Sequence, residues 1–149
     1  MRYFCTNCNY TYDEGLGDKE EDIAIWTKID DIKYCPVCEE PHSFHGIEEE
    51  VNYLDNEENM SLLELDHIPV IKIKDDSLEV NVWLNPHPMW DEHRITTISI
   101  YDEYEDLVFE EFLYPDMEPK ANFDISDLDD FEVRVKCSIH WVWGKKIVR

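Results

Sequence analysis

Short segments rich in β-branched and aromatic residues dominate the second half of the chain. From residue 69 onward, turn-forming residues such as those at 75–77 separate these segments, and apolar and polar positions alternate within several of them. Both properties are typical of β-strands. The predicted strands cover residues 71–74, 78–84, 95–101, 107–113, 131–137 and 142–148. Because no helical pattern interrupts them, we predict an immunoglobulin-like antiparallel β-sandwich.

The segment 131–137 shows the alternation most clearly. Val133, Val135 and Cys137 share one face, and polar residues occupy the positions between them. Side chains alternate between the two faces of a strand, so Cys137 is predicted to point into the core. A buried cysteine is usually a small core residue, and by itself this position does not indicate a metal site.

The first 46 residues contain two Cys-x-x-Cys pairs, Cys5 with Cys8 and Cys35 with Cys38. Each pair can form a knuckle, and two knuckles supply four thiolates in a tetrahedral arrangement that suits zinc or a single iron. So short a segment has little core of its own, and a metal here could serve only to hold it together. We predict a metal module over residues 1–46.

An acidic stretch follows this module. Residues 47–66 include eight acidic residues and no basic residue, and like charges disfavour compact packing. We therefore predict an acidic linker over residues 47–60 and a sandwich domain over residues 61–149.

The charge of −23 excludes several classes of function. Nucleic-acid binding requires clustered Lys and Arg, and an acidic chain has low affinity for anionic membranes. The N-terminus lacks the apolar region of a signal peptide, and no long apolar run is present, so we expect a cytoplasmic protein. In that compartment the cysteine pairs favour metal binding over disulfides.

A second candidate site begins with His87 and His93. Pro86 and Pro88 break this segment, so we predict a rigid loop between the two histidines. Two imidazoles at the ends of a stiff loop suit one metal ion. Exposed histidines in proline-rich loops also often bind nothing, and the pair alone does not decide between these interpretations.

Three further residues favour a metal site over exposed histidines that bind nothing. Cys137 and His140 are spaced to reach one ion from a strand end and its turn, and His67 adds another imidazole. All of these lie at predicted strand ends or in loops, where ligands from different parts of a sandwich can converge. His42 and His45 lie beside the last knuckle and are predicted to be surface residues.

The N-terminal module resembles rubredoxin. The resemblance covers nearly all of residues 2–40, with matching segments at 5–13, 17–18 and 34–38. It implies one iron that passes single electrons, although zinc remains an alternative, and its four ligands would be Cys5, Cys8, Cys35 and Cys38. The family usually has glycine directly after each cysteine pair, where this chain has Asn9 and Glu39.

The remainder, residues 61–149, resembles the iron-binding domain of superoxide reductase of the desulfoferrodoxin and neelaredoxin type. The matching segments are 66–71, 87–95, 119–123, 137–140 and Trp143. The resemblance implies a ferrous iron with an axial thiolate from Cys137, an open sixth position, and four equatorial ligands, His67, His87, His93 and His140. It also implies superoxide as substrate, hydrogen peroxide as product, a rubredoxin-type or other electron donor, and suggests a homodimer.

Two departures from this family bear on function. The Glu-Lys pair that usually precedes the first ligand histidine is replaced by Leu65 and Asp66, so a negative charge stands where a lysine would attract superoxide. Arg94, next to His93, is predicted to supply the missing positive charge and is counted among the catalytic residues. The family's glycine after the last histidine is Trp141 here.

Three functions follow from these patterns. The first is superoxide reductase with an N-terminal redox module. The second is a non-catalytic electron carrier or metal-binding interaction protein that retains the ligands but lacks the Glu-Lys pair. The third is a purely structural role with zinc at both sites, which the mixed five-ligand set disfavours.

Overall fold

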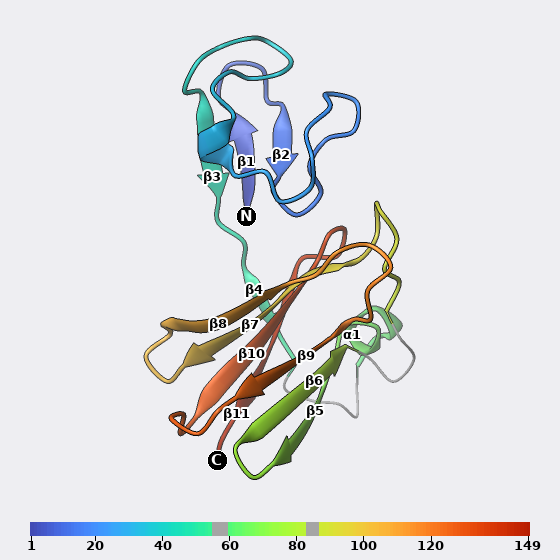
Figure 1. The fold of residues 1–149 in the computed structure, drawn as a ribbon, viewed down its shortest axis with the longest axis vertical. Helices are drawn as coiled ribbons and strands as arrows, with labels where there is room; N and C mark the ends of the chain where they lie inside the picture. The colour runs from blue at the N-terminus through green and yellow to red at the C-terminus, as the bar shows by residue number, and fades with distance from the viewer. Residues whose placement is uncertain (55–59, 83–86) are drawn as a thin grey trace. The chain divides into compact units, whose positions relative to one another are not determined.

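A computed structural model describes residues 1–54, 60–82 and 87–149 (Figure 1). The chain forms two compact units, Met1–Glu49 and Glu50–Arg149. Nearly all regular structure is β; among the described residues there is one short α-helix, and it is neither long nor apolar enough to cross a membrane. The predicted all-β class is therefore confirmed.

The first unit is built on a small antiparallel sheet. Its strands are β1 (Arg2–Cys5), β2 (Thr11–Asp13) and β3 (Phe44–Ile47), in the order β2-β1-β3, and a 3-10 helix spans Ile29–Asp31. The buried apolar side chains of this unit are Cys5, Tyr12 and Cys35. Such a core is small, as predicted from the length of the segment.

The second unit is a two-sheet sandwich. The order of its five-stranded sheet is β4-β11-β10-β7-β8, and the order of its three-stranded sheet is β5-β6-β9. The strands are β4 (Val51–Tyr53), β5 (Pro69–Lys74), β6 (Ser77–Val82), β7 (Ile95–Asp102), β8 (Leu107–Phe112), β9 (Lys120–Asp124), β10 (Phe131–Cys137) and β11 (Val142–Ile147). The helix α1 (Leu62–Leu65) precedes β5.

The core of the sandwich lies between the two sheets. Val80 of β6 and Phe123 of β9 belong to the same buried cluster as Ile98, Val133 and Val135 of the larger sheet. Each predicted strand is found with shifts at its ends, except that residues 83 and 84 of the predicted 78–84 strand lie outside the described residues. Cys137 is fully buried, which confirms the prediction from alternation.

Two features differ from the sequence-based expectation. Strand β9 spans Lys120–Asp124, where the sequence pattern predicts no strand. Strand β4 pairs parallel to β11, so the sandwich is not wholly antiparallel. In this pairing Val51 lies opposite Val142, and the amide of Leu54 donates to the carbonyl of Gly144 at 2.9 Å.

Strand β4 also falls within the range 47–60 predicted as a linker. The second unit begins at Glu50, and Leu54 is buried in its core. The acidic residues Asp55, Glu57 and Glu58 of that predicted linker lie outside the described residues. Val51 and Leu54, which follow a run of acidic residues, therefore pack in the second unit even though the charge pattern predicts a linker there.

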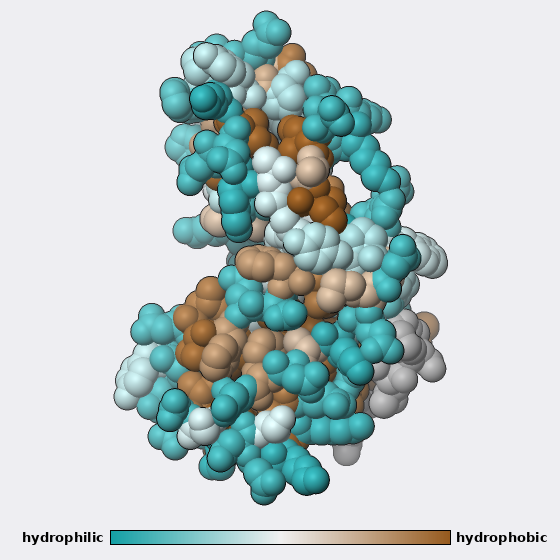
Figure 2. All heavy atoms as spheres, viewed as in Figure 1, coloured by the Kyte–Doolittle hydropathy of each residue, from teal (hydrophilic) through white to brown (hydrophobic). Residues whose placement is uncertain are grey.

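Figure 2 shows hydrophilic side chains around the periphery of each unit and a group of hydrophobic ones in the middle of the visible face of the second unit. The hydrophilic periphery agrees with the high negative charge of the chain. His42 and His45 are exposed, as predicted.

Candidate metal centres

The four cysteines of the first unit come together. Their sulfur atoms all lie within 4.8 Å of one another, with 3.7 Å between Cys5 and Cys38 and 3.6 Å between Cys8 and Cys35. A tetrahedral site with metal–sulfur bonds of about 2.3 Å places its sulfur atoms about 3.8 Å apart. The sulfur positions therefore fit one four-coordinate metal ion.

Both cysteine knuckles form despite the missing glycines. The amide of Asn9 donates to the carbonyl of Cys5 at 2.9 Å, and the amide of Glu39 donates to that of Cys35 at 2.8 Å. Asn9 and Glu39 adopt the left-handed conformation, with φ of 63° and 64°. Glutamate is disfavoured there, so the second knuckle retains its shape at some cost in stability.

Side chains also reach the sulfur atoms. The hydroxyl of Ser43 lies 3.0 Å from Cys5 Sγ, and this contact, opposed by burial and assisted by backbone amides, lowers the pKa of Cys5 to about 6. A hydrogen bond from the Asn7 side chain lowers the pKa of Cys38. Ser43 was not identified from the sequence, because it is far from Cys5 along the chain and only the pairing of β1 with β3 brings the two residues together.

The second cluster lies at one end of the sandwich. Ligand atoms of His67, His87, His93 and Cys137 all lie within 4.8 Å of one another. Cys137 Sγ is 3.6 Å from His87 Nε2 and 3.8 Å from Nδ1 of His140. The ring of His140 packs against those of His67 and His93, each at 5.0 Å between centroids. The structure thus brings together all five residues predicted from the sequence.

The orientation of the imidazoles indicates what this cluster can hold. His67 Nδ1 lies 2.6 Å from the carbonyl of Leu63, and His87 Nδ1 lies 2.8 Å from that of Pro88. Because carbonyls only accept hydrogen bonds, each Nδ1 carries the proton and each Nε2 presents a lone pair.

These two Nε2 atoms face each other at 3.1 Å. His93 Nε2 is also buried, and no hydrogen-bond partner for it exists among the described residues. Two nitrogen ligands at adjacent positions around one metal, each about 2.1 Å from it, lie about 3.0 Å apart. The cluster therefore has the donor atoms and the spacing of a metal site.

Burial keeps these imidazoles in the form that binds metal. Desolvation lowers the pKa of His67 and His93, and lowers that of His87 to about 4. At neutral pH all three rings are uncharged. The negative charge of Asp66 raises the pKa of His67 and His93 and so opposes the effect of burial. This carboxylate is therefore close enough to influence the site.

The helix α1 positions the first histidine. Ser61 and Glu64 form a capping box, in which the Ser61 hydroxyl accepts from the Glu64 amide and the Glu64 carboxylate accepts from the Ser61 amide. The helical turn then presents the carbonyl of Leu63 to His67. The Ser-x-x-Glu pattern was the signal that could have predicted this helix.

A tight turn carries the third histidine. Trp90 donates its amide to the carbonyl of His93 at 3.0 Å, and Met89 forms an isolated bridge with Arg94. Residues 83–86, which precede the turn in the sequence, lie outside the described residues, and the predicted effect of Pro86 falls there.

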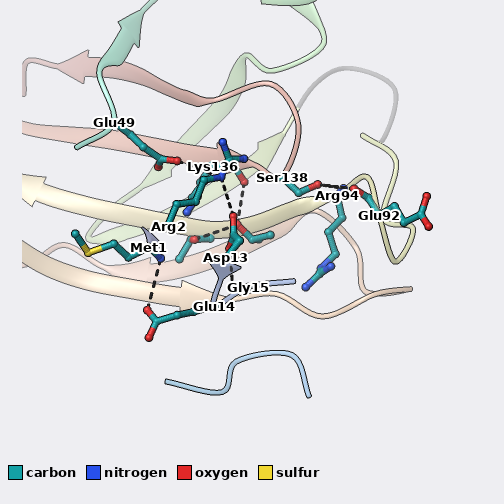
Figure 3. Close-up of polar contacts among 12 residues, drawn as sticks. Met1, Arg2, Asp13, Glu14, Gly15, Glu49, Glu92, Arg94, Lys136 and Ser138 are labelled. Carbon is teal, nitrogen blue, oxygen red and sulfur yellow. Dashed lines mark hydrogen bonds and ion pairs between the residues drawn. The ribbon is translucent and has the colours of Figure 1, made fainter. Parts of the chain in front are cut away.

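Ser138 fastens this turn to the strand that bears Cys137 (Figure 3). Its hydroxyl accepts from the amide of Arg94 at 3.1 Å and donates to the carbonyl of Glu92 at 3.0 Å. Its own amide donates to the carbonyl of Arg94 at 2.9 Å. Three hydrogen bonds therefore connect the residue after the thiolate to the residues around His93.

The side chain of Arg94 extends away from the contact between Ser138 and Glu92 (Figure 3). Its Nη1 donates to the carbonyl of Asp91 at 2.9 Å. Arg94 therefore helps to hold its own turn. Its predicted role as a positive charge for the substrate stays a prediction.

The cluster is more accessible on one side than on the other. His67 and His87 are buried, whereas His93 and His140 are half-buried and the neighbouring Trp141 is exposed. Trp141 has a φ of 68°, so it adopts the left-handed conformation that glycine favours.

Trp143 supports the cluster from within. Its ring stacks on that of His67 at 5.1 Å between centroids and an interplanar angle of 16°, and its Nε1 donates to the carbonyl of His140 at 2.5 Å. One tryptophan thus fixes two of the candidate ligands.

Comparison with known proteins agrees with this organisation. The desulfoferrodoxin family model matches residues 57–146, and the rubredoxin family model matches residues 2–44. Desulfoferrodoxin homologues from Methanothermobacter thermautotrophicus and Archaeoglobus fulgidus are each 35% identical to the chain over 77 residues. These matches cover 52% of this chain and 60% and 59% of the two relatives.

Solved structures share the fold of the second unit. A superoxide reductase from Giardia intestinalis matches with a TM-score of 0.52 and 20% identity, over 56% of this chain and 98% of that one. A variant of the neelaredoxin-type superoxide reductase from Ignicoccus hospitalis matches with a TM-score of 0.50 and 22% identity, over 66% and 93%. With the family model covering more than half of its residues, the chain belongs to the desulfoferrodoxin family and carries an N-terminal rubredoxin-like region.

Proposed function

We propose that this protein reduces superoxide to hydrogen peroxide, consuming one electron and two protons for each superoxide. The reaction would take place at a mononuclear iron held by His67, His87, His93, His140 and Cys137. The observation that carries the proposal is the pair of unprotonated Nε2 atoms of His67 and His87, which face each other at 3.1 Å beside a buried cysteine sulfur. Such an arrangement is unfavourable unless a cation lies between the donor atoms.

The donor set favours iron and superoxide chemistry. When bound, iron would supply the single electron that the substrate takes up, and a thiolate ligand favours that transfer by donating electron density. Burial keeps the imidazoles of His67, His87 and His93 neutral at pH 7, and an imidazole ligand adds no negative charge that would repel an anion. The half-buried edge formed by His93 and His140 is the side from which a small anion can enter.

Electrons must reach this site after each turnover. The four cysteines of the first unit fit a single metal ion, and an iron there would be able to carry one electron. We propose this module or a separate rubredoxin-type protein as the donor. Zinc in the four-cysteine site would leave only the external donor.

Pulse radiolysis of the reduced, iron-loaded protein tests the proposal. Superoxide should disappear in a second-order reaction with the protein, and the Cys137→Ala variant should lose most of that rate. The His45→Ala variant is the control, because it removes an exposed histidine outside the cluster. Equal rates for the wild type and the Cys137→Ala variant, with iron content and fold intact, would reject the proposal.

The alternative is a non-catalytic electron carrier that keeps the same ligands. One observation favours it, namely the carboxylate of Asp66, which acts on His67 and His93 where an anionic substrate would approach. A protein of this kind would bind iron and change oxidation state reversibly without consuming superoxide. Metal analysis combined with the radiolysis experiment separates the two functions.

A further inference from the structure

The hydroxyl of Ser43 lies directly against one of the four sulfur atoms of the first unit. Its Oγ is 3.0 Å from Cys5 Sγ, and both side chains are buried. A cysteine that binds a metal is a thiolate without a proton, so the hydroxyl must be the donor. The carbonyl of Glu40 is a competing acceptor at 3.3 Å, but a bond to a charged sulfur is the stronger of the two.

The sheet of the first unit holds Ser43 in this position. The amide and the hydroxyl of Thr6 both donate to the carbonyl of Ser43, at 2.8 and 3.0 Å. The next residue, Phe44, pairs with Cys5 in the register of β1 and β3. The donor is therefore fixed by the same strands that position the sulfur atom.

Backbone amides also point at Cys5 and Cys38. The hydroxyl of Ser43 thus adds a side-chain hydrogen bond at Cys5 to those from the backbone.

We infer that Ser43 raises the reduction potential of an iron bound by the four cysteines, so that the module retains its electron more strongly. Reduction adds one negative charge to the iron and its thiolates, and hydrogen-bond donors stabilise the more negative state. The effect of Ser43 is specific to this hydroxyl, because water cannot readily take the place of a buried donor. The inference rests on the proposed function only in taking iron as the metal of this site.

Spectroelectrochemical titration of the iron-loaded, full-length protein measures this effect. Ser43→Ala should lower the equilibrium constant for reduction about tenfold, which for one electron is about 59 mV. Ser43→Thr, which keeps a hydroxyl at this position, should restore the wild-type value. The sulfur-to-iron absorption band should move to longer wavelength in Ser43→Ala, because a thiolate without its hydrogen bond gives up charge more easily.

The control is Thr27→Val, which removes another hydroxyl of the same unit, bonded to the carbonyl of Ala24 at 2.7 Å and not to a sulfur. Its potential should match that of the wild type. An unchanged potential in Ser43→Ala, or a lowered potential that threonine does not restore, would overturn the inference. If Ser43→Ala does not fold, Ser43→Gly removes the same hydroxyl, and an unchanged potential in that variant overturns it instead.

The outcome is separable from that of the proposed function. A shifted potential in a protein that does not consume superoxide would support this inference and reject the proposed function. A four-cysteine site that takes up no iron would overturn the inference, while radiolysis of the second site would still test superoxide reduction.

Discussion

The two candidate metal sites are built in opposite ways. In the first unit two of the three buried apolar side chains, Cys5 and Cys35, are themselves candidate ligands. In the second unit the ligands lie at strand ends and turns beside a core that two sheets form mainly from other residues, although Cys137 belongs to that core as well. The comparison indicates that metal ligands can make up most of the core of a small unit, whereas in a larger unit they lie mainly at the edge of a core formed by other residues.

Loss of a cysteine ligand is the strongest test of this comparison. We expect Cys38→Ala to unfold the first unit, because a structural metal in so small a unit contributes about 10 kcal/mol or more to folding. Amide signals of the first unit should collapse in a two-dimensional NMR spectrum, while those of the second unit remain dispersed.

The matched variant for this experiment is His87→Ala. It removes a ligand from the second site and should leave both units folded, since strands of both sheets supply most of the sandwich core and His87 is not part of it. A first unit that stays folded without its metal would break the comparison.

Ser138→Ala tests how the second unit positions its ligands. The variant removes the hydroxyl that joins Arg94 to Glu92, and with it the fixed position of the turn that carries His93. Loss of such a supporting contact lowers metal affinity about 10- to 100-fold. Competition with a chelator measures this, and Ser77→Ala, at an exposed position of β6, should show no change.

Asp66→Lys tests the electrostatics of the same site. Replacing a carboxylate beside the histidines by an ammonium should raise the rate of reaction with superoxide about tenfold at low salt, because anions are then attracted. The gain should shrink as ionic strength rises. Glu103→Lys is the control, because it makes the same change of charge in the turn after β7, at the end of β7 that lies away from the histidines. An equal gain in rate for Glu103→Lys would show that net charge alone is responsible.

Glu39→Gly gives the smallest expected effect. Glu39 has a φ of 64°, and glycine at that position should stabilise the metal-loaded first unit by about 1 kcal/mol. Chemical denaturation monitored by the sulfur-to-metal absorption measures the change. Glu40→Gly, one residue further and without a positive φ, should instead destabilise the unit.

Much of the fold could be read from the sequence, since strand periodicity predicted all but β4 and β9 in the second unit. The cysteine spacing also predicted the gathering of the four sulfur atoms. Ser43 could not be found in this way, because its contact with Cys5 depends on the pairing of distant strands. Strand β4 was not predicted, because the acids around Val51 are typical of a linker. Its partner strand is also 90 residues away in the chain, so no local pattern indicates the pairing.

The pairing of β4 with β11 has a consequence for the handling of this protein. Gly144 permits the close approach, since a Cβ there would lie 2.6 Å from Val51 Cγ1. Without β4, the backbone of β11 would be an open sheet edge, and open edges recruit strands from other molecules. Truncation that removes residues 50–54 should therefore yield a second unit prone to aggregation, so β4 also protects against self-association.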